Sequence, residues 1–123
     1  MTGTPRAASA ALDRAPDARV VIGPLELYPP GLSLRLAGRR VLVAPREYQV
    51  LLLLAQQVDR VVTTRSLLDE VWGEGFVDAH GNLKAQVARV RRCLREHLAV
   101  DPVRTVRGLG YVLDSDVLTG RGT

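Results

Sequence analysis

Apolar residues recur at every second position over much of residues 20–43, with polar or charged residues between them. This period-two alternation is typical of strands that bury one face. The segments Pro29-Pro30-Gly31 and Ala37-Gly38-Arg39 are predicted to form the turns. We therefore predict a small N-terminal antiparallel sheet. Its apolar positions are Leu25, Leu27, Leu32, Leu34, Leu36, Val41 and Val43.

The pattern changes to helical spacing after Ala44. Pro45 suits the first position of a helix, and Glu47 lies in the first turn, where the helix dipole favours an acid. Residues 50–54 are apolar all round, so we expect this helix to be covered on two sides. Thr63 is a suitable N-cap for a second helix. Gly73 and Gly75 are expected to end this helix.

A third helix is predicted to start at Asp78 or Asn82, either of which is a suitable cap, and to end at Leu98. On a helical wheel the apolar residues of this helix form one stripe. Cys93 lies at the edge of the stripe, so we expect a buried or half-buried thiol rather than a nucleophile. The opposite face carries small and cationic residues, and three more cations lie along one edge. The apolar stripe is Leu83, Val87, Val90, Leu94 and Leu98; the opposite face is Ala85, Ala88, Arg89, Arg92 and Glu96; the edge is Lys84, Arg91 and Arg95.

The C-terminal part predicts a β-hairpin, with strands at 103–106 and 111–113 and a tight tip at 107–110 that holds two glycines. The predicted fold class is α+β: a winged helix-turn-helix with an N-terminal antiparallel sheet, three helices and a C-terminal β-hairpin wing. We predict a disordered tail or linker at 1–19, one domain at 20–114 and a tail at 115–123.

Charge is unevenly distributed. All the excess positive charge lies in residues 84–107, which hold seven cations and two acids and so carry +5. Residues 1–83 balance nine arginines against nine acids, and residues 108–123 carry −1, which gives the net charge of +4. A concentrated basic patch is typical of a surface that binds a polyanion. Small side chains beside Arg also suit a helix that enters the major groove, where Arg binds guanine bidentately. The alternative for this face is an ordinary solvated helix surface.

Other functional classes find little support. The longest apolar run is six residues, at 50–55, too short for a membrane span, and no secretory leader is recognisable. Cys93 is the single cysteine, so neither an internal disulfide nor a zinc cluster is expected. No nucleophile has a base at hand, so we expect no enzyme, no cofactor and no metal. A cytoplasmic location is expected.

Five segments resemble the OmpR/PhoB-type output domain of two-component response regulators. They are residues 44–48 (APREY), 60–63 (RVVT), 67–73 (LLDEVWG), 87–92 (VARVRR) and 105–111 (TVRGLGY), the last being the most specific because it matches the family's wing. Residues 82–92 are also similar to the related domain of SARP-type activators.

The resemblance implies double-stranded DNA as the partner, read by the third helix, with the wing in the minor groove. In that helix it assigns bases or phosphates to Lys84, Ala85, Ala88, Arg89, Arg91 and Arg92, with Arg89 the chief base reader. In the wing it assigns Thr105, Arg107 and Gly108 to DNA contacts, with Thr105 at a phosphate and Arg107 in the minor groove. Trp72, Asn82 and Tyr111 are assigned to phosphate contacts or to the helix–wing junction. It further implies an RNA polymerase contact through loop 73–78 and a tandem dimer on DNA.

The chain departs from the family at several positions. Gly81 and residues 83–87 differ from the usual pattern around the start of the third helix, and Ala44 replaces the threonine that caps the first helix. Family members usually carry a phosphorylatable receiver domain before this one, and residues 1–19 are too few to form it. We therefore expect either a free-standing output domain or a fragment of a larger regulator. A winged-helix module that binds a protein partner is the alternative function.

Overall fold

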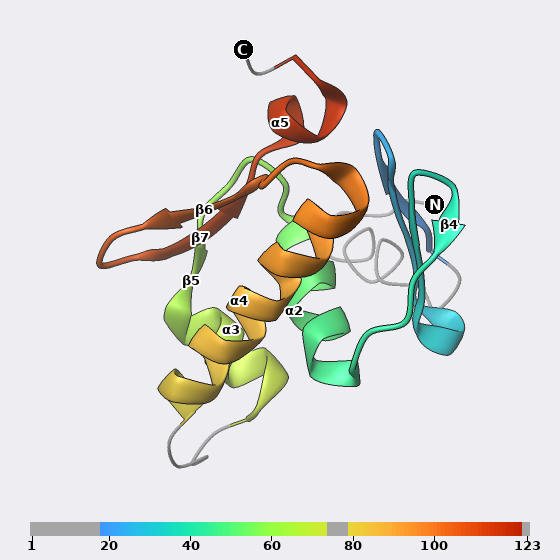
Figure 1. The fold of residues 1–123 in the computed structure, drawn as a ribbon. Coiled ribbons are helices and arrows are strands. Elements are labelled where there is room, and N and C mark those ends of the chain that lie inside the picture. The colour runs from blue at the N-terminus through green and yellow to red at the C-terminus, as the bar shows by residue number, and fades with distance from the viewer. Residues whose placement is uncertain (1–17, 74–78, 122–123) are drawn as a thin grey trace, which may run out of the picture.

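A computed structural model describes residues 18–73 and 79–121, with the backbone alone at 79 and 80 (Figure 1). The chain begins with a four-stranded antiparallel sheet in the order β1-β2-β3-β4, as predicted. Its strands are β1 (Val20–Ile22), β2 (Leu25–Tyr28), β3 (Ser33–Leu36) and β4 (Arg39–Arg40), with the 3-10 turn η1 (Pro30–Leu32) between β2 and β3. Leu25, Leu27, Leu34 and Leu36 all point into the core.

The turn predicted at 37–39 is shorter than expected. Ala37 and Gly38 alone form it, both with positive φ (53° and 81°), and Arg39 already belongs to β4, where it pairs with Leu36. Leu32, predicted on the apolar face, is 45% exposed because it closes η1 rather than continuing a strand.

Three helices follow the sheet, at the predicted places. They are α2 (Pro45–Gln56), α3 (Thr64–Val71) and α4 (Ala79–Leu98). The Thr63 hydroxyl accepts a hydrogen bond from the Ser66 amide (3.1 Å), which confirms Thr63 as the N-cap of α3. Ala44 occupies the N-cap of α2 and provides no side-chain cap, so Pro45 alone marks that start.

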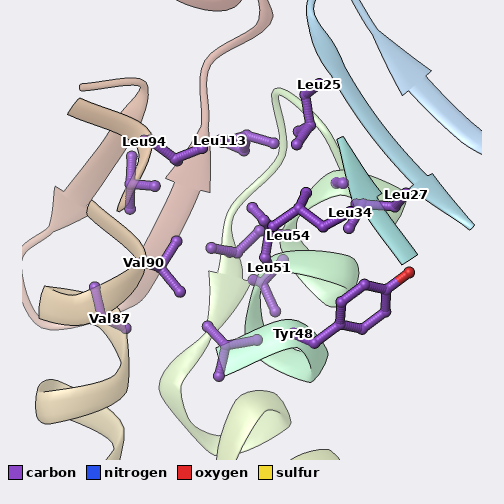
Figure 2. Packing of buried hydrophobic residues seen from close by; sticks show 14 of the residues in the cluster. Leu25, Leu27, Leu34, Tyr48, Leu51, Leu54, Val87, Val90, Leu94 and Leu113 are labelled. Atoms are coloured by element: carbon purple, nitrogen blue, oxygen red, sulfur yellow. The ribbon is translucent and has the colours of Figure 1, made fainter. Parts of the chain in front are cut away.

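The core lies on both sides of α2 (Figure 2). Leucines of the N-terminal sheet pack on one side of α2, and the buried stripe of α4 packs on the other. Tyr48 of α2 is fully buried, and its hydroxyl donates to the Ser33 carbonyl oxygen (2.9 Å), which ties α2 to the sheet. The prediction of a helix covered on two sides is confirmed.

A second sheet forms the wing. Its strands are β5 (Val62–Thr63), β6 (Val103–Val106) and β7 (Gly110–Leu113), antiparallel in the order β5-β7-β6. The β6–β7 hairpin extends from the body of the domain beside α4 (Figure 1). The short strand β5, which sequence analysis did not predict, anchors this hairpin to the segment between α2 and α3.

The segment after Asp114 was expected to be a tail, but it forms the helix α5 (Ser115–Thr119). The Asp114 carboxylate caps it by accepting hydrogen bonds from the amides of Asp116 and Val117 (2.9 and 3.3 Å). Leu118 is buried, and α5 packs on β1. Within the described ranges, no helix has both the length and the apolar character needed to span a membrane.

Candidate nucleic-acid interface

One face of α4 is buried in the core, and the opposite face is exposed to solvent. Leu83, Val87, Val90 and Leu94 are at most 4% exposed, and Leu98 is half-buried. The five residues predicted on the opposite face are all exposed, which confirms the helical wheel; they are Ala85, Ala88, Arg89, Arg92 and Glu96. We call four of them, together with the exposed edge residue, the open face: Lys84, Ala85, Ala88, Arg89 and Arg92. Their two alanines leave the backbone accessible between the cationic side chains.

The helix starts at Ala79, which agrees with the earlier of the two predicted starts, although Asp78 itself lies outside the described residues. Asn82 is therefore within the helix and not at its cap, and it is exposed. This lengthens α4 ahead of the open face by one turn.

The wing tip is a tight turn with an exposed cation. The Leu109 amide donates to the Val106 carbonyl oxygen (2.9 Å), and Gly108 has a φ of 77°, a conformation that favours glycine. Arg107 is exposed in this turn. The Leu109 carbonyl oxygen accepts from the Thr64 amide (2.9 Å), so the tip is held against the start of α3.

Gly110 has a different role from the hairpin glycine that was expected. A Cβ there would collide with the Val62 carbonyl oxygen and would lie 2.8 Å from the Thr63 Cα. The absence of a side chain lets β7 approach β5, and this close approach fixes the end of β7 next to the wing tip.

Three of the seven cations in the basic stretch are paired with acids. The Asp101 carboxylate accepts hydrogen bonds from Arg91 Nε (3.2 Å) and Arg95 Nη1 (3.3 Å). Arg104 Nε donates to Asp114 (2.7 Å), and this hydrogen bond lowers the pKa of the Asp114 carboxyl. The ion pairs of Arg91, Arg95 and Arg104 were not predicted from the sequence.

The other four cations remain available. Lys84, Arg89, Arg92 and Arg107 make no ion pair or side-chain hydrogen bond with other residues in the described part of the chain. Three of them lie on the open face and one at the wing tip. Within residues 84–107, the unpaired positive charge is therefore concentrated on these two elements.

A hydrogen bond joins the two elements. Arg91 Nη1 donates to the Thr105 hydroxyl of β6 (3.2 Å), so the edge of α4 is attached to the wing. Both residues were predicted to contact DNA, and the structure brings them together. Their contact with DNA stays a prediction.

The residues assigned to phosphate contacts or the helix–wing junction lie on separate elements. Trp72 is half-buried at the end of α3, and the Arg46 guanidinium of α2 lies 5.2 Å from its ring centroid. Tyr111 is half-buried in the central strand β7, between Val62 and Thr105. Trp72 is thus held by α2, a contact that sequence analysis missed. Of the loop predicted to contact RNA polymerase, only Gly73 is among the described residues.

Cys93 is half-buried, as predicted. Burial raises the pKa of its thiol, and the charges of Glu47 and Glu96 raise it further. Such a thiol is a weak nucleophile at neutral pH. Among the described residues, no three histidine, cysteine or acidic side chains gather where they can hold a metal ion.

Known proteins resemble this chain along most of its described length. The DNA-binding domain of CpxR from E. coli has 25% sequence identity and a TM-score of 0.69, covering 78% of this chain and 95% of that one. The Klebsiella pneumoniae RstA DNA-binding domain, solved in complex with the RstA box, has 20% identity and a TM-score of 0.65, covering 79% of this chain and 97% of that one.

Among curated proteins, the transcriptional regulatory protein PrrA of Mycobacterium leprae is 33% identical over 94 residues, which are 76% of this chain and 40% of PrrA. The chain spans less than half the length of the curated relatives it matches. The family described as "Transcriptional regulatory protein, C terminal" matches residues 38–113. The chain therefore belongs to this family, the non-enzymatic OmpR/PhoB-type winged-helix DNA-binding domains of bacterial response regulators.

Proposed function

We propose that the chain recognises a specific double-stranded DNA sequence, with α4 in the major groove and the wing in the minor groove. The open face of α4 carries this proposal, because Ala85 and Ala88 leave room for close approach while Arg89 and Arg92 keep all their donors available. Arg is the side chain that binds the N7 and O6 atoms of guanine bidentately.

We assign roles by position. Arg89 lies at the family's base-reading position and reads a base, and Arg92 and Lys84 contact bases or phosphates beside it. Thr105 contacts a phosphate, and Arg91 contacts one defined base or phosphate of the selected site while its hydrogen bonds to Asp101 and Thr105 hold it in place. Arg107 enters the minor groove, whose negative potential is strongest where A·T-rich DNA narrows it. Trp72, Asn82 and Tyr111 contact phosphate or support the junction.

The protein as a whole is proposed to regulate transcription in the bacterial cytoplasm. The RstA domain, which has the same fold, is bound to a DNA box in its crystal structure. By analogy with the family, loop 73–78 contacts RNA polymerase, and two copies bind in tandem on direct repeats. Tandem binding places half-sites about one helical turn apart.

Selection of bound duplexes from a random pool with the purified chain tests the proposal. We expect one recovered sequence, bound at least about a thousandfold more tightly than random duplex. Affinity should fall with salt at a slope of about −0.9 per phosphate contact. No measurable binding to selected or random duplex at about 50 mM salt would favour the alternative, a module that binds a protein partner.

A further inference from the structure

The carboxylate of Asp101 forms ion pairs with two arginines of α4. Asp101 lies between α4 and β6, and its Oδ2 atom accepts from Arg91 Nε (3.2 Å) and from Arg95 Nη1 (3.3 Å), one turn further along α4. The Asp101 and Arg91 side chains are 29% and 31% exposed, whereas that of Arg95 is 52% exposed. The Arg91 side chain is therefore half-buried, whereas the cations of the open face are exposed.

Arg91 extends this contact to the wing. Its Nε atom binds Asp101 and its Nη1 atom binds the Thr105 hydroxyl (3.2 Å). A guanidinium presents its donors in a rigid planar fork, so fixing two of them fixes the whole group. The other carboxylate oxygen of Asp101, Oδ1, is buried and has no hydrogen-bond partner within the described ranges, so the two arginines bind the carboxylate through Oδ2 alone.

We propose that Asp101 is a specificity-determining positioning residue: it keeps Arg91 and Arg95 from indiscriminate phosphate contacts and fixes the wing against the recognition helix. This inference rests on the proposed function. Attraction between cations and phosphates strengthens binding to every sequence equally. Cations held by a carboxylate add less to that attraction. Sequence preference depends on side chains held in register with base edges, which requires α4 and the wing to keep a fixed relation.

The change Asp101→Asn tests this on folded protein. It removes the charge that holds the two arginines and keeps the size of the side chain. Each arginine released onto a phosphate should steepen the salt slope on random duplex by about 0.9. Between 50 and 200 mM salt, the loss of random-duplex affinity should then grow about 3.5-fold for one released arginine and about 12-fold for two. The preference for the selected site should fall because random binding strengthens and the wing loosens.

Asp116→Asn is the matched control. Asp116 is an exposed acid on α5, outside the proposed DNA surface, makes no ion pair within the described part of the chain, and its substitution changes the net charge by the same amount. It releases no arginine, so the salt slope and the ratio of selected to random affinity should stay at the parent values. Arg91→Lys separates charge from geometry: it keeps the cation, but a single ammonium lacks the planar fork. It should lower the preference for the selected site.

Side-chain NMR provides a readout without DNA. The Arg91 Nε–H signal should exchange slowly with water in the parent and in the Asp116 variant, and quickly in Asp101→Asn. An unchanged salt slope and an unchanged preference in folded Asp101→Asn would overturn the inference. Failure of the parent itself to bind either duplex would contradict the proposed function and this inference with it. The parent's own titration distinguishes that result.

Discussion

Truncation of Leu94 to alanine gives the sharpest test of how α4 is oriented. Leu94 is fully buried on the helix face opposite Arg92, in the layer between α4, α2 and β7 (Figure 2). Buried Leu→Ala changes cost about 2–5 kcal/mol, more where the surroundings cannot close the cavity. Two helices and a sheet strand fix the walls of this site, so we expect a loss of about 3 kcal/mol or more.

Urea unfolding followed by circular dichroism measures this loss. With a denaturant slope of about 1–3 kcal/mol per molar urea, the midpoint should fall by about 1–3 M. The matched control is Leu42→Ala, because Leu42 is 87% exposed and its truncation should change stability by less than about 0.5 kcal/mol. Equal midpoints for the parent and the Leu94 variant would refute our assignment of buried and open faces.

The remaining predictions concern DNA binding, the wing and the core. Arg89→Ala should cost about 1–3 kcal/mol on the selected duplex and relax preference at one base pair, whereas an equal loss on random duplex would limit Arg89 to phosphate contact. Arg107→Ala should leave the melting temperature unchanged, weaken binding by about 1–2 kcal/mol, and reduce the salt slope by about one unit; unaltered affinity for A·T-rich sites would exclude the minor groove. Gly110→Ala should destabilise the domain by about 3 kcal/mol in urea, because its Cβ collides with β5, and a parent-like midpoint would contradict that close approach. Burial raises the pKa of Tyr48 to about 12, so the folded state favours the neutral phenol; this stability is complete below about pH 10 and is lost as the pH rises towards 12. Tyr48→Phe should remove that alkaline loss in urea titrations at several pH values, and the same decline in the variant would assign it to other groups.

Local signals in the sequence predict the main elements well. Pro45 and Thr63 mark helix starts, and the stripe from Leu83 to Leu94 gives the correct orientation of α4 because its spacing follows the helical period. The open face, the hairpin and the exposed Arg107 follow from the same rules. These features depend on residues close together along the chain.

The features that sequence analysis missed depend on contacts across the fold or on very short segments. Helix α5 has five residues and one buried side chain, Leu118, which is too little for a periodic signal. Only two residues mark the limits of this helix: Asp114 caps its start, and Gly120, in the left-handed conformation, follows its end. Strand β5 has two residues and is defined by its pairing with β7.

The charge count gave the location of the basic stretch but not the charge that is available. Asp101 follows α4 closely in sequence, yet its two ion pairs depend on how the chain turns towards β6. Arg91 and Thr105 were identified separately as DNA contacts, and their hydrogen bond joins elements that sequence rules treat one at a time. Spacing along one helix does not predict such a contact.

Amide chemical shifts of the chain, recorded while the selected duplex is added, identify the surface that contacts DNA. We expect the largest shifts at residues 84–92 of α4 and 105–108 of the wing, whereas the amides of β1 to β4 should move little. Random duplex at the same salt should move the same regions less. A shift map centred on the N-terminal sheet, or on the outer surface of α2 and α3, would contradict recognition through the open face.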